Sequence, residues 1–295
     1  MVPNLCDLRN RFTSTVFKTL LVFVFISSPL AGFSQQYWQV GGFLGASNYS
    51  GDLSEKRVDF RYTRYAIGLF AKRDFNRYFT LRAAFNYGRV AGADSTNRTA
   101  DLKDRNLSFR SPIIEANLVG EFNFLDIDQH GWTPYVFGGI GIFSFYPTTE
   151  DAVGNKIELR RLTTEGQGLP MYPTRKQYNL RSPSIPFGAG AKVLVKDNWV
   201  VGFEIGLRKT FTDYIDDVSM GYVDRNTLLT YRGQQSVNYA YRGTGEYPVD
   251  GYPRGSAKYD DWYIFSGFTV AYRFGGTKGP WGHWKKQKAS ECPRM

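Results

Sequence analysis

The chain has 295 residues, of which 42% are hydrophobic and 17% aromatic, and its formal net charge at pH 7 is +10. No stretch reaches the run of about 20 apolar residues that a spanning helix needs, which counts against a helical membrane protein. The basic excess would suit an anionic partner, but the chain has no aromatic-and-basic recognition motif, so we expect no nucleic acid partner.

The first 34 residues predict a cleavable export signal. Basic residues between positions 9 and 18 precede a short apolar run at 19–26, and small residues follow as far as Ser34. This order of charged head, apolar middle and small-residue end is that of a secretory signal. We therefore expect the mature chain to begin near Gln35, with a net charge of about +8 after loss of three basic residues and Asp7.

Between Trp38 and Phe274, eight segments alternate apolar and polar residues. In the clearest one, Phe79, Leu81 and Phe85 share a face and Arg82 lies on the other. Because strand side chains alternate with period two, each segment has one apolar face. The predicted strands cover residues 38–46, 63–72, 78–90, 114–124, 134–146, 185–195, 199–208 and a last strand that ends at 274.

The segments joining these strands are long and short in turn, at 48–61, 73–77, 92–106, 126–133, 147–184, 196–198 and 212–258. This rhythm predicts an all-β fold, an eight-stranded antiparallel transmembrane β-barrel of the outer membrane at 35–274, with long extracellular loops and short periplasmic turns. Aromatic residues near the strand ends are typical of the girdles at the two membrane interfaces. A secreted all-β sandwich is the alternative.

Six charged residues on the polar faces of the strands predict ion pairs inside the barrel. An eight-stranded barrel is filled by its own side chains, so we expect no pore. Unpaired charges in such an interior would be strongly destabilising, which favours a structural role over transport. The six residues are Arg82, Glu115, Glu121, Lys192, Glu204 and Arg208.

The chain offers little for catalysis. His130 falls in a short turn and His283 in the tail, so no base lies on a strand and we expect no enzyme. A single mature cysteine and two scattered histidines match no ligand spacing, so we expect no metal or cofactor. Three aspartates, at 213, 216 and 217, open the last long loop; we favour a solvated loop face over a calcium site there.

Residues 275–295 form a predicted periplasmic C-terminal tail that is basic and bears tryptophans. A simple barrel usually stops at its last strand, so this extension is suited to dock a partner; a disordered charged end is the alternative. Cys292 is an odd cysteine in an oxidising compartment, which suggests an intermolecular disulfide. The expected partner-binding residues are Trp281, His283, Trp284, Lys285, Lys286, Cys292, Pro293 and Arg294.

Three stretches resemble the PorG family of Bacteroidetes outer-membrane proteins, components of the type IX secretion system. They are residues 40–53, with Ser-Asn-Tyr and Gly-Asp; residues 134–147; and Tyr-Arg-Phe-Gly at 272–275 with Cys-Pro-Arg at 292–294. The resemblance implies a small barrel that associates with a periplasmic ring of a lipoprotein and its partner, PorK and PorN. The tail from Gly275 would then be the docking element and Cys292 a covalent link.

Two functions follow. The first is a non-catalytic outer-membrane component of type IX secretion, which binds PorK/PorN-like ring proteins through its periplasmic turns and tail and contacts outer-membrane lipid and lipopolysaccharide. The alternative is a freestanding barrel whose last loop binds an external ligand or surface. The tyrosines of that loop are Tyr222, Tyr231, Tyr239, Tyr241, Tyr247 and Tyr252.

Overall fold

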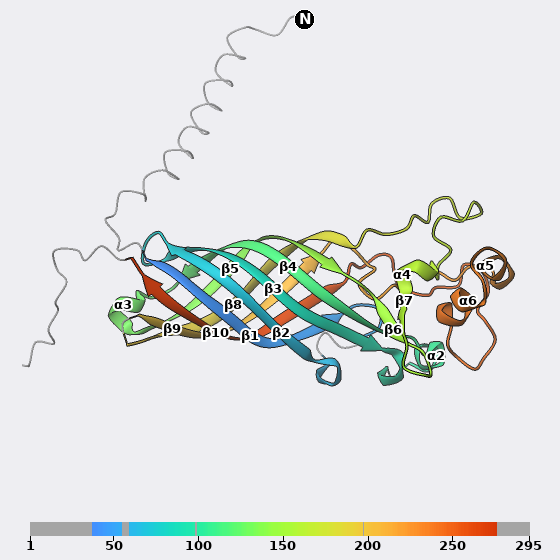
Figure 1. Ribbon diagram of the computed structural model, residues 1–295, viewed down its shortest axis with the longest axis horizontal. Coiled ribbons are helices and arrows are strands. Elements are labelled where there is room, and N and C mark those ends of the chain that lie inside the picture. Colours follow the sequence, from blue (N-terminus) through green and yellow to red (C-terminus); the bar gives the residue numbers. More distant parts are fainter. Residues whose placement is uncertain (1–36, 55–58, 98, 197, 276–295) are drawn as a thin grey trace, which may run out of the picture.

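Eight long antiparallel strands close into a barrel in the computed structural model, which describes residues 37–54, 59–97, 99–196 and 198–275 (Figure 1). Strand β1 pairs with β10 and β3 with β4, so the eight strands form a closed ring. The predicted fold class is confirmed. The strands are β1 (Trp38–Ser50), β2 (Arg64–Asp74), β3 (Phe79–Ala93), β4 (Ser108–Asn123), β5 (Trp132–Phe145), β8 (Arg181–Val195), β9 (Trp199–Thr210) and β10 (Trp262–Phe274).

Several strands are longer than the alternation predicted at the end of the barrel where the long loops emerge, namely β1, β3, β4, β8 and β9. Strand β8 begins at Arg181 rather than at 185, although Pro183 and Pro186 lie in its first half. Proline cannot donate to a strand ladder and argues against a strand from sequence. Both prolines nevertheless pair, Pro183 with Ile142 and Pro186 with Arg208.

The connections alternate between the two ends of the barrel, as predicted. Short turns, one of them carrying α3 (Ile127–His130), lie at one end, and the long connections gather at the other (Figure 1). The long connections contain regular structure that the sequence analysis did not predict: η2 (Phe60–Tyr62), η3 (Asp94–Thr96), α2 (Ala100–Arg105), β6 (Thr148–Glu150), β7 (Lys156–Glu158), α4 (Leu159–Leu162), α5 (Arg225–Arg232) and α6 (Gln234–Ala240).

The outer wall of the barrel is apolar. Leu44 on β1, Leu69 on β2, Ile140 on β5 and Phe268 on β10 are 62–72% exposed, and each faces away from the lumen. Aromatic side chains, among them Trp132 near the short-turn end, stand at the strand ends. A continuous exposed apolar surface with aromatic ends is that of a transmembrane barrel and excludes the sandwich alternative.

None of the helices in the described residues is long and apolar enough to cross a membrane.

Candidate functional site

Buried charged residues meet inside the barrel, toward the end where the short turns lie. Glu121 of β4 forms an ion pair with Lys72 of β2 at 2.8 Å and accepts from Lys192 of β8 at 2.9 Å, and Arg82 of β3 lies 3.3 Å away. Arg82 also contacts Glu204 of β9 at 2.7 Å. Each of these side chains is at most 8% exposed, so the ion pairs hold five strands together in the absence of bulk water.

A second group of interior contacts lies closer to the long loops. Arg208 donates to Glu115 at 3.2 Å, and Tyr263 donates its hydroxyl to the same carboxylate at 2.6 Å. The Arg208 guanidinium lies 4.6 Å from the centroid of the Phe265 ring. Because charged and aromatic side chains fill the cross-section of the barrel interior, the lumen is packed rather than open, as expected for eight strands.

All six charged residues singled out from the sequence lie in this interior network. Lys72 belongs to it as well and was missed. Lys72 is the last residue of the predicted second strand and adjoins the basic turn at 73–77. The sequence indicated no ion-pair partner for it there. Its position on the same face as Phe70, opposite the exposed Ile67 and Leu69, is the signal that would have identified it.

The short-turn end of the barrel is fixed by a charged contact. Arg273, the penultimate residue of β10, pairs with both carboxylate oxygens of Asp128 in α3, at 2.8 and 3.1 Å. The same guanidinium lies 3.9 Å from the centroid of the Tyr37 ring. The start of the first strand, the end of the last strand and the α3 turn are therefore held together.

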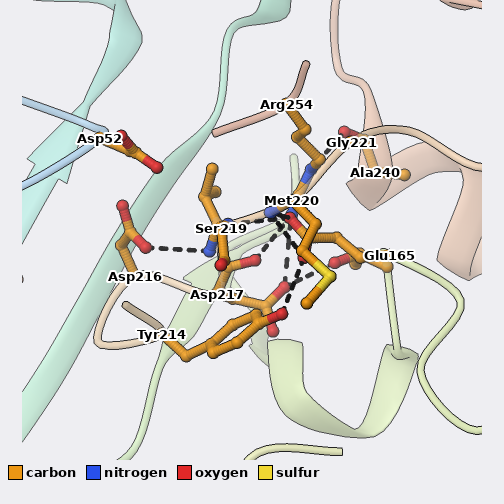
Figure 2. Close-up of polar contacts among 12 residues, drawn as sticks. Asp52, Glu165, Tyr214, Asp216, Asp217, Ser219, Met220, Gly221, Ala240 and Arg254 are labelled. Atoms are coloured by element: carbon orange, nitrogen blue, oxygen red, sulfur yellow. Dashed lines mark hydrogen bonds and ion pairs between the residues drawn. The ribbon is translucent and has the colours of Figure 1, made fainter. Parts of the chain in front are cut away.

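The long loops fold into one unit over the other end of the barrel, which we call the cap (residues 51–54, 59–63, 94–97, 99–107, 146–180 and 211–261). At its centre Glu165 faces Arg254, with 3.0 Å between Oε1 and Nη1 (Figure 2). Glu165 also accepts from the backbone N–H groups of Ser219 and Met220, at 2.9 and 3.2 Å, and from the Tyr214 hydroxyl at 3.2 Å. Glu165 is fully buried.

Arg254 extends this contact to the rest of the last loop. It donates to the carbonyl oxygens of Asp217 at 2.6 Å and Ala240 at 3.2 Å. The Asp217 carboxylate accepts in turn from the hydroxyls of Tyr178 at 2.6 Å and Thr164 at 2.7 Å. The loops that follow β5 and β9 are therefore joined by paired, water-excluded contacts, and this polar centre is a structural latch.

The two shorter loops are joined to the same unit. Arg105 of α2 pairs with Asp94 at 2.6 Å and donates to the Arg254 carbonyl oxygen. Asp52, which follows β1, accepts from the backbone N–H of Ser256 at 2.7 Å. All four long connections thus contribute to the cap, and none of them is an independent loop.

An aspartate cluster lies beneath this latch, where the cap meets the barrel. The Tyr49 hydroxyl is 2.7 Å from Asp216 Oδ2 and 2.7 Å from Asp261 Oδ1. A hydroxyl has one hydrogen, so it donates to one carboxylate and must accept from the other, which requires a protonated carboxyl group. Asp213 is 8% exposed, and neither of its carboxylate oxygens has a hydrogen-bond partner within the described parts of the chain.

The crowding of these carboxyl groups shifts their titration. Burial, followed by the charges of Asp216 and Asp52, raises the pKa of Asp213 to about 9. Burial and the charge of Asp261 raise the pKa of Asp216 well above its ordinary value. Burial raises the pKa of Asp217 to about 6, against the opposing charge of Arg254. At neutral pH the cluster therefore keeps protons that free aspartates would have lost.

The prediction of a solvated aspartate face is wrong. Asp213, Asp216 and Asp217 are 8%, 1% and 0% exposed, because the last loop folds back over the mouth of the barrel. Within the described residues, no group of three or more His, Cys, Asp and Glu side chains is arranged to hold a metal ion. His130 is exposed in the α3 turn, away from the cap.

The loop tyrosines divide into packed and exposed members. Tyr222 is buried, and its ring packs against those of Tyr241, Tyr247 and Tyr252, with centroids 5.6–6.5 Å apart. Tyr231 on α5 is 49% exposed. Of the six loop tyrosines, Tyr222 is thus buried in the cap, and Tyr231 and Tyr252 are exposed.

Comparison with known proteins gives a family. The model of one protein family matches residues 15–245, and this family is described as a domain of unknown function, DUF6089. The chain belongs to this family. No curated protein matches it in sequence.

Several solved structures are similar to this chain at low sequence identity. Ail, the attachment invasion locus protein of Yersinia pestis, is 10% identical with a TM-score of 0.40, over 81% of this chain and 99% of that one. Neisserial surface protein A is 11% identical with a TM-score of 0.37, over 81% and 97%. The outer membrane protein OprG from Pseudomonas aeruginosa is 8% identical with a TM-score of 0.36, over 82% and 96%. The likeness concerns the fold alone.

Two of the predictions fall outside the described residues. The export signal, residues 1–34, and the eight tail residues proposed to bind a partner, from Trp281 to Arg294, both lie there. The boundaries of the signal and the tail therefore stay predictions. The cap residues Glu165, Arg254 and Asp261 were missed because their partners are far away in the sequence.

Proposed function

We propose that the protein is a non-catalytic outer-membrane component of the type IX protein secretion machinery that anchors a periplasmic ring of PorK- and PorN-like proteins. The observation that carries this proposal is the closed interior: Glu121 and its cationic partners fill the lumen, and the cap covers one mouth. A barrel filled in this way offers its ends and its outer surface for function, and no passage.

The short-turn end is the proposed docking end. Strand β10 ends there, and the Arg273 contact with Asp128 fixes the position from which the chain continues. In the proposed orientation this end faces the periplasm. The sequence that follows carries Trp281, Trp284 and several lysines, a composition suited to pack against and pair with a protein surface. We assign the docking role to this segment together with the short turns.

The alternative of a freestanding adhesive barrel has less support. It requires the loop tyrosines to be available at the surface, whereas Tyr222 is buried and the rings of Tyr241, Tyr247 and Tyr252 pack against it. Its remaining candidates are Tyr231 and Tyr252, which are 49% and 48% exposed. Alanine at these two positions should leave adhesion unchanged if the protein is an assembly component.

The proposal is tested by purifying the tagged protein from membranes of its own cells under non-reducing conditions. We expect periplasmic ring proteins to co-purify with the native chain and to be lost on deletion of residues 279–295, with the barrel still in the membrane. Replacement of Val153, an exposed residue of the β6–β7 turn at the cap end, by serine is the matched control and should retain them.

Cys292→Ser separates the covalent link from the docking role. Loss of a high-mass band with retention of the ring proteins would support docking together with a disulfide. Retention of the band would overturn the disulfide. Absence of ring proteins from the native sample would overturn the proposed function itself.

A further inference from the structure

A groove of about 590 Å³ lies on the outer wall of the barrel at its loop end, between β2–β4 and the β6–β7 hairpin. The hairpin projects from the end of β4, where Arg110 pairs with Thr148, and Thr148 donates its hydroxyl to the Arg110 carbonyl oxygen at 2.9 Å. Arg242, from the last loop, donates to Thr149 at 3.1 Å and to the Glu150 carbonyl oxygen at 3.3 Å. The groove is therefore held in shape by the cap.

The lining of the groove is strongly cationic. Four of its residues are basic, and Glu150, its single carboxylate, pairs with Arg110. Within the described part of the chain, Arg64, Arg89 and Lys156 form no salt bridge. Three cations beside one another on an outer surface repel each other unless an anion lies between them. The basic residues are Arg64, Arg89, Arg110 and Lys156.

The groove adjoins the apolar wall of the barrel. Arg89 lies 5.5 Å above the centroid of the Tyr65 ring and donates to the Tyr87 hydroxyl at 3.0 Å, so two aromatic rings support its guanidinium. The next outward-facing residues along these strands toward the barrel middle are Ile67 and Phe85, which are 46% and 56% exposed. Cations, interfacial tyrosines and lipid-facing apolar residues thus follow one another along a single wall.

We propose that this groove binds the phosphate groups of a phosphorylated outer-leaflet glycolipid, whose acyl chains lie on the wall formed by β2–β4. Arginine guanidinium groups bind phosphate oxygens in a bidentate manner, and cations at the membrane surface attract anionic headgroups. The apolar wall directly beside the cations selects a lipid over a free anion. The site lies at the end opposite to the proposed periplasmic docking end and is independent of it.

The test titrates the full chain, folded in neutral detergent, with purified lipopolysaccharide, with its dephosphorylated form and with inorganic phosphate. Native mass spectrometry and calorimetry report binding. We expect lipopolysaccharide to bind, and both other probes to bind at least about tenfold more weakly, because each lacks one half of the ligand. Equal binding of the dephosphorylated form would overturn the phosphate site, and equal binding of inorganic phosphate would overturn the lipid assignment.

The variant that tests the residues carries Arg64→Gln, Arg89→Gln and Lys156→Gln. We expect it to bind lipopolysaccharide about tenfold or more weakly than the native chain. The matched control carries Lys103→Gln, Lys176→Gln and Arg225→Gln, which removes the same charge from exposed cap positions and should retain affinity. Equal loss in both variants would overturn a specific groove.

Two further readouts keep the result interpretable. The heat-dependent gel shift of a folded barrel identifies variants that fail to fold, and Lys156→Gln alone, on the exposed hairpin, then replaces the triple variant with a smaller expected loss. Ring proteins should still co-purify with every groove variant. Failure of lipid binding with intact co-purification would thus overturn this inference and leave the proposed function standing.

Discussion

The barrel lumen and the cap both bury charged groups, but they neutralise them differently. In the lumen Glu121 is surrounded by three cations, and Glu115 and Glu204 each have an arginine and a tyrosine hydroxyl. Beneath the cap, aspartates crowd one another and share protons with a tyrosine. The lumen is therefore held by ion pairs across strands, whereas the base of the cap depends on protonation.

The largest loss of stability should come from removing a charge of the interior network. Glu121→Leu removes the carboxylate that Lys72, Lys192 and Arg82 share, and leaves these cations buried without it. We expect the free energy of unfolding to fall by about 3 to 5 kcal/mol. Urea unfolding of the barrel in lipid vesicles measures this loss. A change below about 1 kcal/mol would show that the lumen is hydrated and that the network is not structural.

Removing the cation of the latch in the cap should cause a smaller loss of stability, confined to the cap. Arg254→Met removes the cation that faces the buried Glu165 and the donor to the Asp217 carbonyl oxygen. We expect a loss of about 3 kcal/mol, confined to the cap. Hydrogen exchange should accelerate over residues 159–176 and 211–261 and stay unchanged in β1 to β5. Faster exchange throughout the barrel would contradict the separation of the two regions.

The protonation of the aspartate cluster predicts a pH dependence of the cap. The folded-state pKa of Asp213 is about 9, above that of a free aspartate, so between about pH 4 and 9 the folded cap binds more protons than the unfolded one. Cap stability should therefore be greatest below pH 4 and fall as the pH rises toward 9. Hydrogen exchange of the cap at pH 5 and pH 8, corrected for the intrinsic rate, measures this trend.

Asp213→Asn sharpens the same point. An amide has no charge to form, so the variant should stabilise the cap by about 2 kcal/mol at pH 8 and have little effect at pH 4. The matched control is Asp151→Asn, because Asp151 lies in the outer β6–β7 turn, outside the cluster. A cap whose pH dependence is the same in the native chain and in Asp213→Asn would contradict the raised pKa of Asp213.

The smallest effect is expected where a charge pair is exposed. Glu158 and Arg161 form a surface ion pair, with side chains 32% and 77% exposed. A double-mutant cycle should give an interaction energy of at most about 0.5 kcal/mol, because water screens the pair. A value near that of the Glu121 contacts would show that burial does not distinguish the two kinds of pair.

The barrel could be predicted from sequence because its rules are local. Alternation with period two places Phe85 outside and Arg82 inside. The lengths of the connections indicate which of them lie at each end of the barrel. Six of the interior charges were predicted in this way. Lys72 was missed because it stands beside a turn, where alternation is weak evidence.

The cap could not be predicted because its contacts join distant segments. Glu165 and Arg254 are 89 positions apart, and Tyr49 lies 212 positions from Asp261. No periodicity connects such residues, and short helices such as α6 are stabilised by burial against other loops rather than by their own sequence. The aspartates of the last loop looked solvated for the same reason.

The central claim, that this barrel is sealed and acts as an anchor, is tested most directly by conductance. The purified full chain is inserted into planar lipid bilayers, with a porin as positive control, and current is recorded under applied voltage. We expect no discrete conductance steps, because paired side chains fill the lumen and the cap covers its mouth. Reproducible channel openings from the native chain would contradict it.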